Sequence, residues 1–384
     1  MPRPLPPRAD VVVIGGGVMG ASTAFHLAEA GASVVLLERD ALASGSTSRA
    51  AGGVRAQFSD PLNIAIAVRS LEAFRAFADR PGGAIDLHLT GYLFLLDREE
   101  DVAVFERSVA LQNELGVPSR VVDAREAASL SPLAGVDGVL VATFCALDGH
   151  ASPEAVTLGY AGGARGHGAT VLTGVTATAV EVRDGTVHGV ATDAGAVEAE
   201  TVVCAAGVWS PALCRTAGLE LPVSAVLREV VTTAPANGLP GSVPLTVDFS
   251  TGFYFHREGP GLLLGMADRD QPPGFDEPTD PGWLERVSEV AARRAPAFLE
   301  LGIAHRWKGY YEVTPDHNGL VGEAREIERL FYATGFSGHG FMQAPAVGEI
   351  VRDLVLGREP FVDVSPLSVE RFASDAPRPE HNVI

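Results

Sequence analysis

A segment near the N-terminus constrains the fold of this chain more than any other feature of its sequence. Residues 10–14 (DVVVI) form an apolar, β-branched run that predicts a buried parallel strand. A G-x-G-x-x-G turn follows at 15–20, and the alanine-rich stretch 21–30 predicts a helix. A second apolar run, 33–37, then ends in Glu38. This order of strand, glycine turn, helix, strand and acid predicts an α/β unit that binds a dinucleotide.

The residues of the glycine turn have distinct physical roles. Gly15 allows a tight turn, Gly17 lets a pyrophosphate approach the backbone, and Gly20 lets the helix pack closely against the strand. The helix N-terminus presents unpaired N–H groups to the phosphates. We therefore expect cofactor contacts at these three glycines and at the two residues between them, Val18 and Met19.

The acid at the end of the second strand bears on the identity of the dinucleotide. Glu38 lies 18 residues past Gly20, where its carboxylate can accept hydrogen bonds from both ribose hydroxyls. It would repel a 2′-phosphate, which argues against NADP, although the neighbouring Arg39 weakens that argument. Glu38 and Arg39 are both candidate cofactor contacts.

The charge balance excludes several classes of partner. The 384 residues include 48 acidic and 29 basic ones, a net charge of −19, and such a field repels nucleic-acid backbones and anionic lipid. Cys145, Cys204 and Cys214 form no CxxC pair, so we expect no metal site. Residues 1–8 do not resemble a signal peptide, and no apolar stretch reaches about 18 residues. We expect a cytoplasmic protein that acts on a small molecule.

A loop after Glu38 indicates a longer cofactor than NAD. Residues 43–55 (ASGSTSRAAGGVR) supply hydroxyl groups, a fixed charge and two glycines, where NAD enzymes have a short connection. A flexible linker has a similar Ser/Gly composition, but two arginines, Arg49 and Arg55, bracket the glycines and favour a binding loop. The cofactor contacts that we expect from this loop are Ser44, Ser46, Thr47, Ser48, Arg49, Gly52 and Gly53.

Two later segments carry similar chemistry. Residues 201–210 form an apolar strand that ends in small residues, which let the backbone pack against a flat group. Residues 330–347 form a strand, a glycine-rich turn and a helix start, whose N-terminus would stabilise negative charge on a reduced flavin ring. Three separated glycine sites fit FAD, whose parts extend over a long path. The contacts expected from these segments are Ala205, Ala206, Gly207, Trp209, Gly335, Gly338, His339, Gly340, Phe341 and Met342.

With these motifs the chain resembles the D-amino acid oxidase superfamily of flavoproteins, in the branch of sarcosine oxidase, glycine oxidase and the dimethylglycine and proline dehydrogenases. The glycine turn, Glu38-Arg39, the 43–55 loop, CAAGVWS at 204–210 and ATGFSGHGF at 333–341 carry the resemblance. It implies FAD, a backbone contact near Ala177, and oxidation of a C–N bond beside a carboxylate. The implied fold is α/β (α+β overall): a glutathione-reductase-like Rossmann domain for FAD, with an inserted substrate domain built on a mixed or antiparallel sheet.

The resemblance also implies that the domains are discontinuous in sequence. We expect the FAD-binding domain in 1–88, 150–220 and 305–384, and the substrate domain in 89–149 and 221–304. Within these ranges, residue patterning predicts a strand at 91–96 and helices at 99–115, 153–164, 281–297 and 349–356.

Candidate substrate contacts follow from the same family. Hydride transfer from the substrate C–H to flavin N5 requires a neutral amine whose carboxylate is held in place, and arginine is best suited to holding it. Arg55 matches the arginine that binds the substrate carboxylate in sarcosine oxidase, although a surface role is the alternative for any of 28 arginines. Tyr254 and Tyr311 match active-site positions of the family, and Tyr254 is equally compatible with core packing.

Two further residues are candidates on separate grounds. His256 lies two residues after Tyr254, on the same strand face, where it could take a proton from the amine; a lone histidine is more often structural. Lys308 is the single lysine of the chain, which suggests a use specific to an amine. Strand alternation could instead direct it away from Tyr311.

Departures from the family pattern narrow the expected reaction. Met342 stands where sarcosine oxidase has a second cationic carboxylate ligand, and Leu263 stands near its oxygen-activating lysine. The residues that attach FAD covalently in relatives are replaced near Gly309 and near Ser48-Arg49, so we expect non-covalent FAD. We expect a secondary or cyclic amine, bulkier or more apolar than sarcosine, to be oxidised to an imine, with oxygen as default acceptor. A dehydrogenase that uses a carrier or partner subunit, and a flavin-bearing assembly factor without turnover, remain alternatives.

Overall fold

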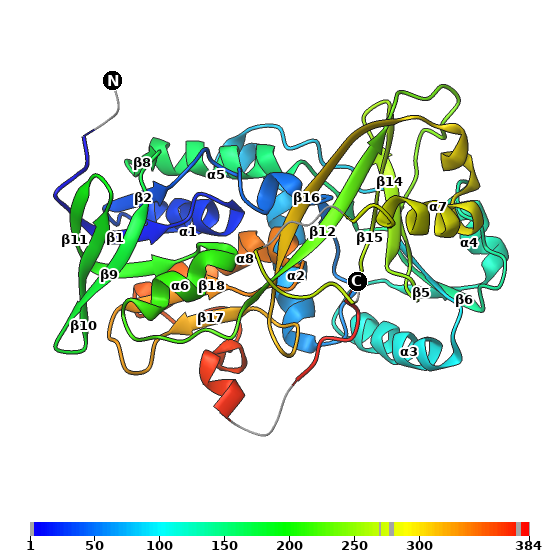
Figure 1. Cartoon of the computed structure of the whole chain (residues 1–384). Coiled ribbons are helices and arrows are strands. Elements are labelled where there is room, and N and C mark those ends of the chain that lie inside the picture. The colour runs from blue at the N-terminus through cyan, green and yellow to red at the C-terminus, as the bar shows by residue number, and fades with distance from the viewer. Residues whose placement is uncertain (1–3, 269, 276–279, 374–377, 384) are drawn as a thin grey trace.

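Two large β-sheets organise the chain and lie side by side (Figure 1). The computed structural model describes residues 4–268, 270–275, 280–373 and 378–383. The first sheet occupies the left half of Figure 1 and the second sheet the right half, and the long strands β12 and β16 of the second sheet lie near the middle of the molecule. The eight α-helices of the described residues are α1 (Val18–Glu29), α2 (Pro61–Arg75), α3 (Glu99–Glu114), α4 (Ala124–Leu130), α5 (Pro153–Gly166), α6 (Ser210–Arg215), α7 (Trp283–Arg294) and α8 (Gly340–Val355).

The first sheet is built around the predicted N-terminal strand. β1 pairs in parallel with β2 on one side and with β11 on the other, and β8 and β18 extend this parallel core outward. β9, β10 and β17 join it by antiparallel pairing. Its strands are β1 (Arg8–Ile14), β2 (Val34–Glu38), β8 (Thr170–Thr173), β9 (Ala177–Arg183), β10 (Thr186–Thr192), β11 (Gly195–Cys204), β17 (Leu320–Glu323) and β18 (Leu330–Thr334).

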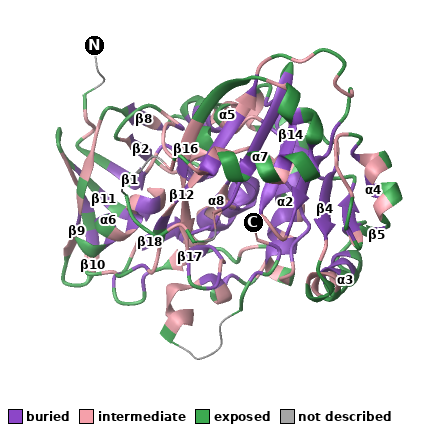
Figure 2. Cartoon of the chain, turned by 45° about the vertical axis from the view of Figure 1, so that its right-hand side comes forward, coloured by how far each residue is buried: buried purple, intermediate pink, exposed green. Residues whose placement is uncertain are grey.

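Successive side chains of β1 point to opposite faces of the first sheet, and each face is covered by its own core cluster. Val11 and Val13 pack toward the helices α1, α2, α5 and α8, whereas Val12 and Ile14 pack toward β9, β10 and α6. Because successive strand residues point to opposite faces, a continuous apolar run such as 10–14 requires cover on both sides. Figure 2 shows these buried residues at the centre of the molecule, along β1 and α8.

The second sheet is antiparallel except for the pair β4–β13, which is parallel. On β14, Phe253 and Phe255 pack against α7, while Tyr254 belongs to the cluster on the opposite face. Tyr254 is thereby directed toward the first half of the molecule. The strands, in sheet order, are β16 (Ile303–Val313), β12 (Ser224–Thr233), β15 (Gly261–Met266), β14 (Phe253–Glu258), β13 (Leu245–Asp248), β4 (Tyr92–Leu96), β6 (Val141–Cys145) and β5 (Arg120–Val122).

The predicted fold class is confirmed, and the differences in detail have local causes. α1 begins at Val18, earlier than predicted, because the glycine turn passes directly into the first helical turn. α8 begins at Gly340 rather than near residue 349, since the glycine-rich segment itself supplies the first turn. β16, which the sequence analysis assigns mostly to the FAD-binding domain, pairs along its length with β12 of the second sheet. The domain boundaries themselves stay a prediction.

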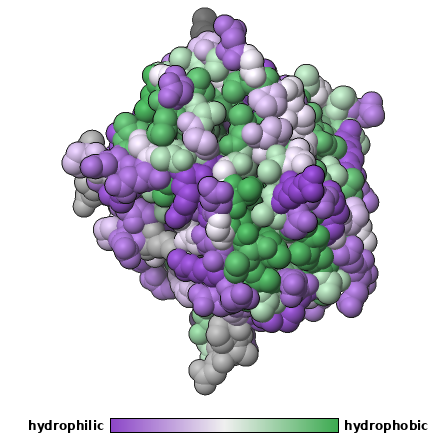
Figure 3. Space-filling model, turned by 90° about the vertical axis from the view of Figure 1, so that its right-hand side faces the viewer, coloured by the Kyte–Doolittle hydropathy of each residue, from purple (hydrophilic) through white to green (hydrophobic). Residues whose placement is uncertain are grey.

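The outer surface carries separate apolar patches. Figure 3 looks onto the face formed by the second sheet and shows hydrophobic side chains gathered between polar ones. Exposed apolar residues at this end of the molecule include Leu115, Val121 and Leu140. Among the described residues, no helix is both long enough and apolar enough to cross a bilayer.

Candidate functional site

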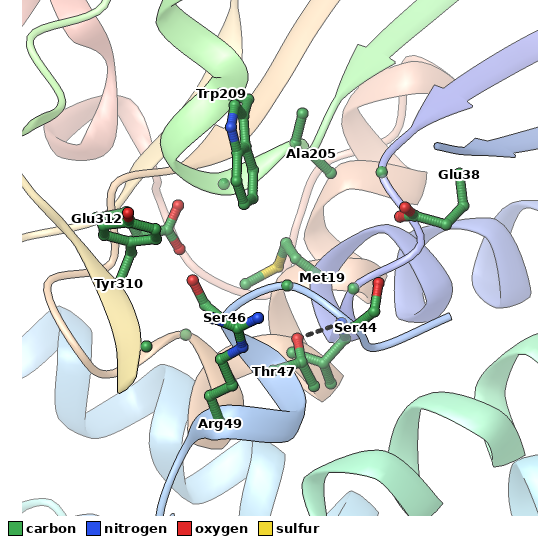
Figure 4. A pocket seen from close by; sticks show the side chains of 18 of the residues that line it. Met19, Glu38, Ser44, Ser46, Thr47, Arg49, Ala205, Trp209, Tyr310 and Glu312 are labelled. Atoms are coloured by element: carbon green, nitrogen blue, oxygen red, sulfur yellow. Dashed lines mark hydrogen bonds between the residues drawn. The ribbon is translucent and has the colours of Figure 1, made fainter. Parts of the chain in front are cut away.

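A cavity of about 390 Å³ lies at the carboxyl ends of the parallel strands of the first sheet. Ile14 of β1, Glu38 of β2, Ala205 after β11 and Ala333 of β18 all line it. In open parallel sheets this edge is where ligands bind, because the helix N-termini that follow the strands point toward it. Figure 4 shows the cavity from close by, with side chains from both sheets directed into it.

The glycine turn forms one wall of this cavity, with the backbone at very close approach. Gly15 has a φ of +111°, and a Cβ there would lie 2.3 Å from the carbonyl oxygen of Ala205. A Cβ on Gly20 would lie 1.9 Å from the carbonyl oxygen of Gly15. Gly20 itself does not line the cavity. Its position therefore fits the expected role in helix–strand packing and does not fit direct contact with a ligand.

Glu38 is held rigidly at the edge of the cavity. Its carboxylate accepts hydrogen bonds from the backbone N–H groups of Gly16 and Asp40, each at 2.7 Å. Its remaining lone pairs can accept from hydroxyl groups of a ligand. The side chain of Arg39 does not pair with the Glu38 carboxylate. It pairs with Asp40 at 2.9 Å, and its guanidinium lies over the ring of Trp209, 4.4 Å from the ring centre.

The loop after Glu38 is tied to both halves of the molecule. Thr47 Oγ1 accepts from the backbone N–H of Val18 at 3.1 Å, which joins the loop to the start of α1. Arg49 donates to the carbonyl oxygen of Lys308 at 3.0 Å, and Trp307 Nε1 donates back to the carbonyl of Arg49 at 3.1 Å. The linker alternative is therefore wrong for this loop. Ser44, Ser46, Thr47 and Arg49 line the cavity, whereas Ser48 does not.

The start of α8 forms another wall of the cavity, next to Tyr311 and Glu312 of β16. Gly338, Gly340 and Phe341 line the cavity, and α8 begins without a side-chain cap. Glu312, which the sequence analysis missed, also lines it (Figure 4). Its carboxylate accepts from Thr334 Oγ1 at 2.8 Å and from the N–H of Gly335 at 3.0 Å, and burial raises its pKa. Gly335 does not line the cavity; its N–H group holds the carboxylate of Glu312, which does.

A second, smaller cavity of about 70 Å³ adjoins the first. The two share Tyr254 and Tyr311, together with the loop residues Ala50 and Ala51 and the start of α8. Residues of the smaller cavity that the sequence analysis predicted are Gly52, Gly53, Arg55, Tyr254, Tyr311, Gly338, His339, Phe341 and Met342. The structure thus brings together loop, strand and helix segments that are far apart in sequence.

Arg55 lies almost completely buried in the wall of the smaller cavity, with 2% of its surface exposed. Its guanidinium stacks over the ring of Phe58 at 4.1 Å and donates to the carbonyl oxygens of Gln57 and, at 2.5 Å, Asn382. A buried position excludes the alternative of a surface arginine. Asn382 lies more than 300 residues from Arg55 in sequence, so local sequence patterns do not predict this contact.

Three tyrosines surround the place where the cavities meet. Tyr92, Tyr254 and Tyr311 are buried, and burial raises the pKa of each. All three hydroxyls are therefore protonated at neutral pH and can act as hydrogen-bond donors. For Tyr311, the positive charges of Arg228 and Arg55 oppose that rise.

Two candidate catalytic residues lie outside both cavities. His256 is fully buried, and its ring nitrogens lie 2.8 Å from the carbonyl oxygen of Arg257 and 2.9 Å from that of Ala51. It supports the loop at Ala51 instead of facing a substrate. His256 also lies near His150 and Glu258, and the possible ligand atoms of the three residues lie within 4.8 Å of one another.

Lys308 is directed away from the cavity, toward Glu229, its pairing partner on the neighbouring strand β12. Its ammonium group lies 3.8 Å from the carboxylate of Glu229, which also pairs with Arg306 at 2.6 Å. Its neighbours Gly309 to Glu312 line the cavity and Lys308 does not. The contribution of Lys308 to the cavity is its backbone carbonyl, which accepts from Arg49.

Arg228 of β12 is another charged lining residue that the sequence analysis missed. Its guanidinium lies 5.2 Å from the centre of the Tyr311 ring and donates to the carbonyl oxygens of Leu227 and Asp268. The only sequence signal is a charged pair, Arg228-Glu229, inside an otherwise apolar strand. Such a pair does not reveal which of the two residues faces the interior.

Comparisons with known proteins find similarity over most of the chain. The model of the family described as "FAD dependent oxidoreductase" matches residues 10–354. "FAD-dependent oxidoreductase domain-containing protein 1" of Xenopus laevis is 32% identical, over 99% of this chain and 86% of that protein.

Two solved structures are similar over nearly the whole chain. L-proline dehydrogenase from P. horikoshii superposes with a TM-score of 0.92 at 32% identity, over 97% of this chain and all of that one. Glycine oxidase from Geobacillus kaustophilus superposes with a TM-score of 0.85 at 28% identity, over 95% of this chain and 99% of that one. The resemblance drawn from the sequence motifs is confirmed.

Proposed function

The chain belongs to the family of FAD dependent oxidoreductases, and we propose that it oxidises the C–N bond of a secondary or cyclic amine that carries a carboxylate. The substrate loses a hydride from the carbon beside nitrogen and a proton from the nitrogen, and becomes an imine. FAD, when bound, accepts the hydride and its two electrons. Molecular oxygen is the default final acceptor, giving hydrogen peroxide.

The residues around the larger cavity fit FAD. Gly17 gives the start of α1 no side-chain cap, and apart from the N–H of Val18, which donates to Thr47, the N–H groups of the first turn can bind the pyrophosphate. Glu38 presents carboxylate oxygens for the ribose, and Arg49 and the uncapped start of α8 provide positive potential at the other end. The attachment residues of relatives are absent at Ser48 and Gly309, so we propose that FAD is held without a covalent bond.

The smaller cavity supplies the substrate contacts of this proposal. Arg55 binds the carboxylate by charge-assisted hydrogen bonds, which fixes the substrate relative to the ring site. The hydroxyls of Tyr254 and Tyr311, kept protonated by burial, donate to polar atoms of the substrate. Because the neighbouring His339 has a pKa held well below its usual range by burial, it contributes no charge of its own.

One observation carries the proposal: the buried guanidinium of Arg55 faces a small cavity that opens onto the dinucleotide cavity past Tyr254 and Tyr311. A fixed cation next to the expected ring position suits an anionic small molecule. The solved proteins with similar folds, an L-proline dehydrogenase and a glycine oxidase, have names that agree with an amino acid substrate.

The test is reduction of the flavin without oxygen. The purified holoenzyme would be mixed anaerobically with sarcosine, N-methyl amino acids, proline and both enantiomers of common amino acids. Bleaching of the flavin absorbance by one compound supports amine oxidation and identifies its class. If none bleaches the flavin while dithionite does, the enzymatic proposal is overturned and a non-catalytic flavoprotein is favoured.

A dehydrogenase of the same chemistry is the second candidate, and Leu263 favours it. This residue of β15 is buried in the apolar cluster that includes Tyr254 and Val230, so no cation stands there to assist reaction with oxygen. Admitting air to the bleached enzyme distinguishes the two. Recolouring within seconds indicates an oxidase, and recolouring over many minutes indicates a dehydrogenase that needs another acceptor.

A further inference from the structure

Two guanidinium groups face the joined cavities, and neither forms an ion pair with a carboxylate among the described residues. Arg55 lies in the smaller cavity, donates to the backbone carbonyl oxygens of Gln57 and Asn382, and is hydrogen-bonded to the side chain of Tyr92. Arg228 lies in the larger cavity and donates to the carbonyl oxygens of Leu227 and Asp268. The Nε of Arg228 is buried and has no hydrogen-bond acceptor.

The alternation of β12 explains why Arg228 faces the cavity without an acid. Glu229, the next residue, points to the opposite side of the strand, where Arg306 and Lys308 neutralise it. The strand therefore places its acid among cations and its arginine at the cavity. Burial lowers the pKa of Arg228, although a guanidinium remains charged in a protein.

The acids nearest these arginines are engaged elsewhere. Asp268 pairs with Arg286 at 3.1 Å, and Glu312 is hydrogen-bonded by Thr334 and Gly335. Asp148, behind the smaller cavity, accepts from Gln57 and from the N–H of Ala56, and burial raises its pKa to about 6. Asp148 and Asp268 each act on one of the two guanidinium groups through their charge, but neither carboxylate forms an ion pair with Arg55 or Arg228.

Both positive charges act on the same tyrosine. Tyr311 lines both cavities, its ring lies beside Arg228, and the charges of Arg228 and Arg55 both lower the pKa of its hydroxyl. Tyr311 therefore lies between two cationic subsites. A buried cation without a counterion is costly, and a ligand with a matching anion relieves that cost.

We propose that the substrate is an amine with two carboxylates, one bound by Arg55 and the other by Arg228, with the reacting C–N bond next to Tyr311 and Tyr254. This inference rests on the proposed function and specifies its substrate class. A substrate with a single carboxylate leaves one of the two guanidinium groups without a partner. A dicarboxylic secondary amine, such as N-(carboxymethyl)glycine or an N-methyl derivative of an acidic amino acid, satisfies both.

The test compares anions that cannot be oxidised, so that it does not depend on turnover. The absorbance of the bound flavin would be titrated with succinate, glutarate and butyrate at constant ionic strength. In the wild-type holoenzyme, at least one dicarboxylate should bind about 10- to 100-fold more tightly than butyrate. In the amine panel, N-(carboxymethyl)glycine should half-saturate flavin reduction at a correspondingly lower concentration than sarcosine.

Variants separate the two subsites. Arg228→Gln should abolish the preference for a dicarboxylate and leave butyrate binding within about threefold, whereas the control Arg306→Gln, on the neighbouring strand but outside the cavity, should keep the preference. If Arg228→Gln fails to load FAD, Arg228→Lys retains the charge and should retain the preference.

Two outcomes would overturn the inference. One is that wild-type enzyme binds the dicarboxylates no more tightly than butyrate. The other is that Arg228→Gln weakens butyrate and dicarboxylates equally, which means that both arginines bind one carboxylate. Neither result touches the proposed function, which instead fails if no amine reduces the flavin.

Discussion

At the scale of single residues, the surroundings of Arg55 bear on the carboxylate-binding role proposed for it. Its guanidinium is buried against Phe58 and is held by the carbonyl oxygens of Gln57 and Asn382, which leaves its other N–H groups for the cavity. Planar, fixed donors of this kind suit a carboxylate better than a flexible lysine does. The exposed Arg75, at the end of α2, offers a matched control.

Substitution of Arg55 tests its binding role directly. We expect Arg55→Gln to raise the substrate concentration for half-maximal flavin reduction by roughly 10- to 1000-fold, because a charge-assisted hydrogen-bonded pair is lost. Stopped-flow reduction at several substrate concentrations measures this, and Arg75→Gln should match wild type. Unchanged half-saturation in a variant that still binds FAD would remove Arg55 from the substrate site.

At the scale of elements, the packing of α1 against β1 depends on one glycine. A Cβ on Gly20 would lie 1.9 Å from the backbone oxygen of Gly15, and neither backbone can move without disturbing the glycine turn. Gly162, in the middle of α5, has no atom near its Cβ position. The two glycines therefore provide opposite predictions for the same substitution.

We expect Gly20→Ala to destabilise the protein by about 1–3 kcal/mol and to weaken FAD binding at the turn. Gly162→Ala should instead be neutral or stabilise by about 0.5–1 kcal/mol, since alanine favours a helix interior. Urea denaturation and titration of the apoprotein with FAD measure the two effects. Equal stability of the two variants would contradict the close packing at Gly20.

The C-terminal segment 378–383 is a second element on which the site depends. Glu380, which is 2% exposed, accepts hydrogen bonds from Ser59, Asp60, Asn63 and Asn382. Through Asn382 this network reaches the guanidinium of Arg55. The segment therefore joins the substrate cavity to the loop before α2.

Removing the Glu380 carboxylate leaves several buried donors without an acceptor. We expect Glu380→Ala to lower the free energy of unfolding by about 2–4 kcal/mol and to raise half-saturation by substrate more than it lowers the limiting rate of reduction. Glu359→Ala, at an exposed position, serves as the control. A purely structural role would leave half-saturation unchanged in the folded fraction.

At the scale of the whole molecule, FAD should join the two halves. The larger cavity is lined by residues of the first sheet, such as Glu38, and of the second, such as Tyr254 and Arg228. A ligand that binds only the folded protein stabilises it by about 2.7 kcal/mol at 100 times its Kd. The midpoint of thermal unfolding should therefore rise with free FAD concentration.

Non-covalent binding makes this prediction testable in a simple way. Acid precipitation of the holoenzyme should release the yellow colour into the supernatant, and the apoprotein should regain the higher midpoint when FAD is added back. A coloured pellet would reveal a covalent bond. A midpoint that does not depend on free FAD would contradict the position of the cofactor between the two sheets.

The sequence by itself determined the dinucleotide unit and the family. Residues 10–38 form a contiguous motif whose strand, turn and helix are dictated by local rules, so β1, α1 and β2 are found almost as predicted. The loop 43–55 and the start of α8 are equally local, and most of their predicted contacts line the cavities. Glu38, Arg49 and Arg55 were found for this reason.

Only the tertiary structure decided which residues meet the substrate cavity. His256 and Lys308 have chemistry that suits the reaction, yet His256 supports the backbone at Ala51 and Lys308 pairs with Glu229. Arg228 had only an ambiguous local signal and Asn382 had none, because strand register and a contact across more than 300 residues bring them to the site. A residue's chemistry is local, but the direction in which a side chain points depends on strand pairing and on burial against distant parts of the chain.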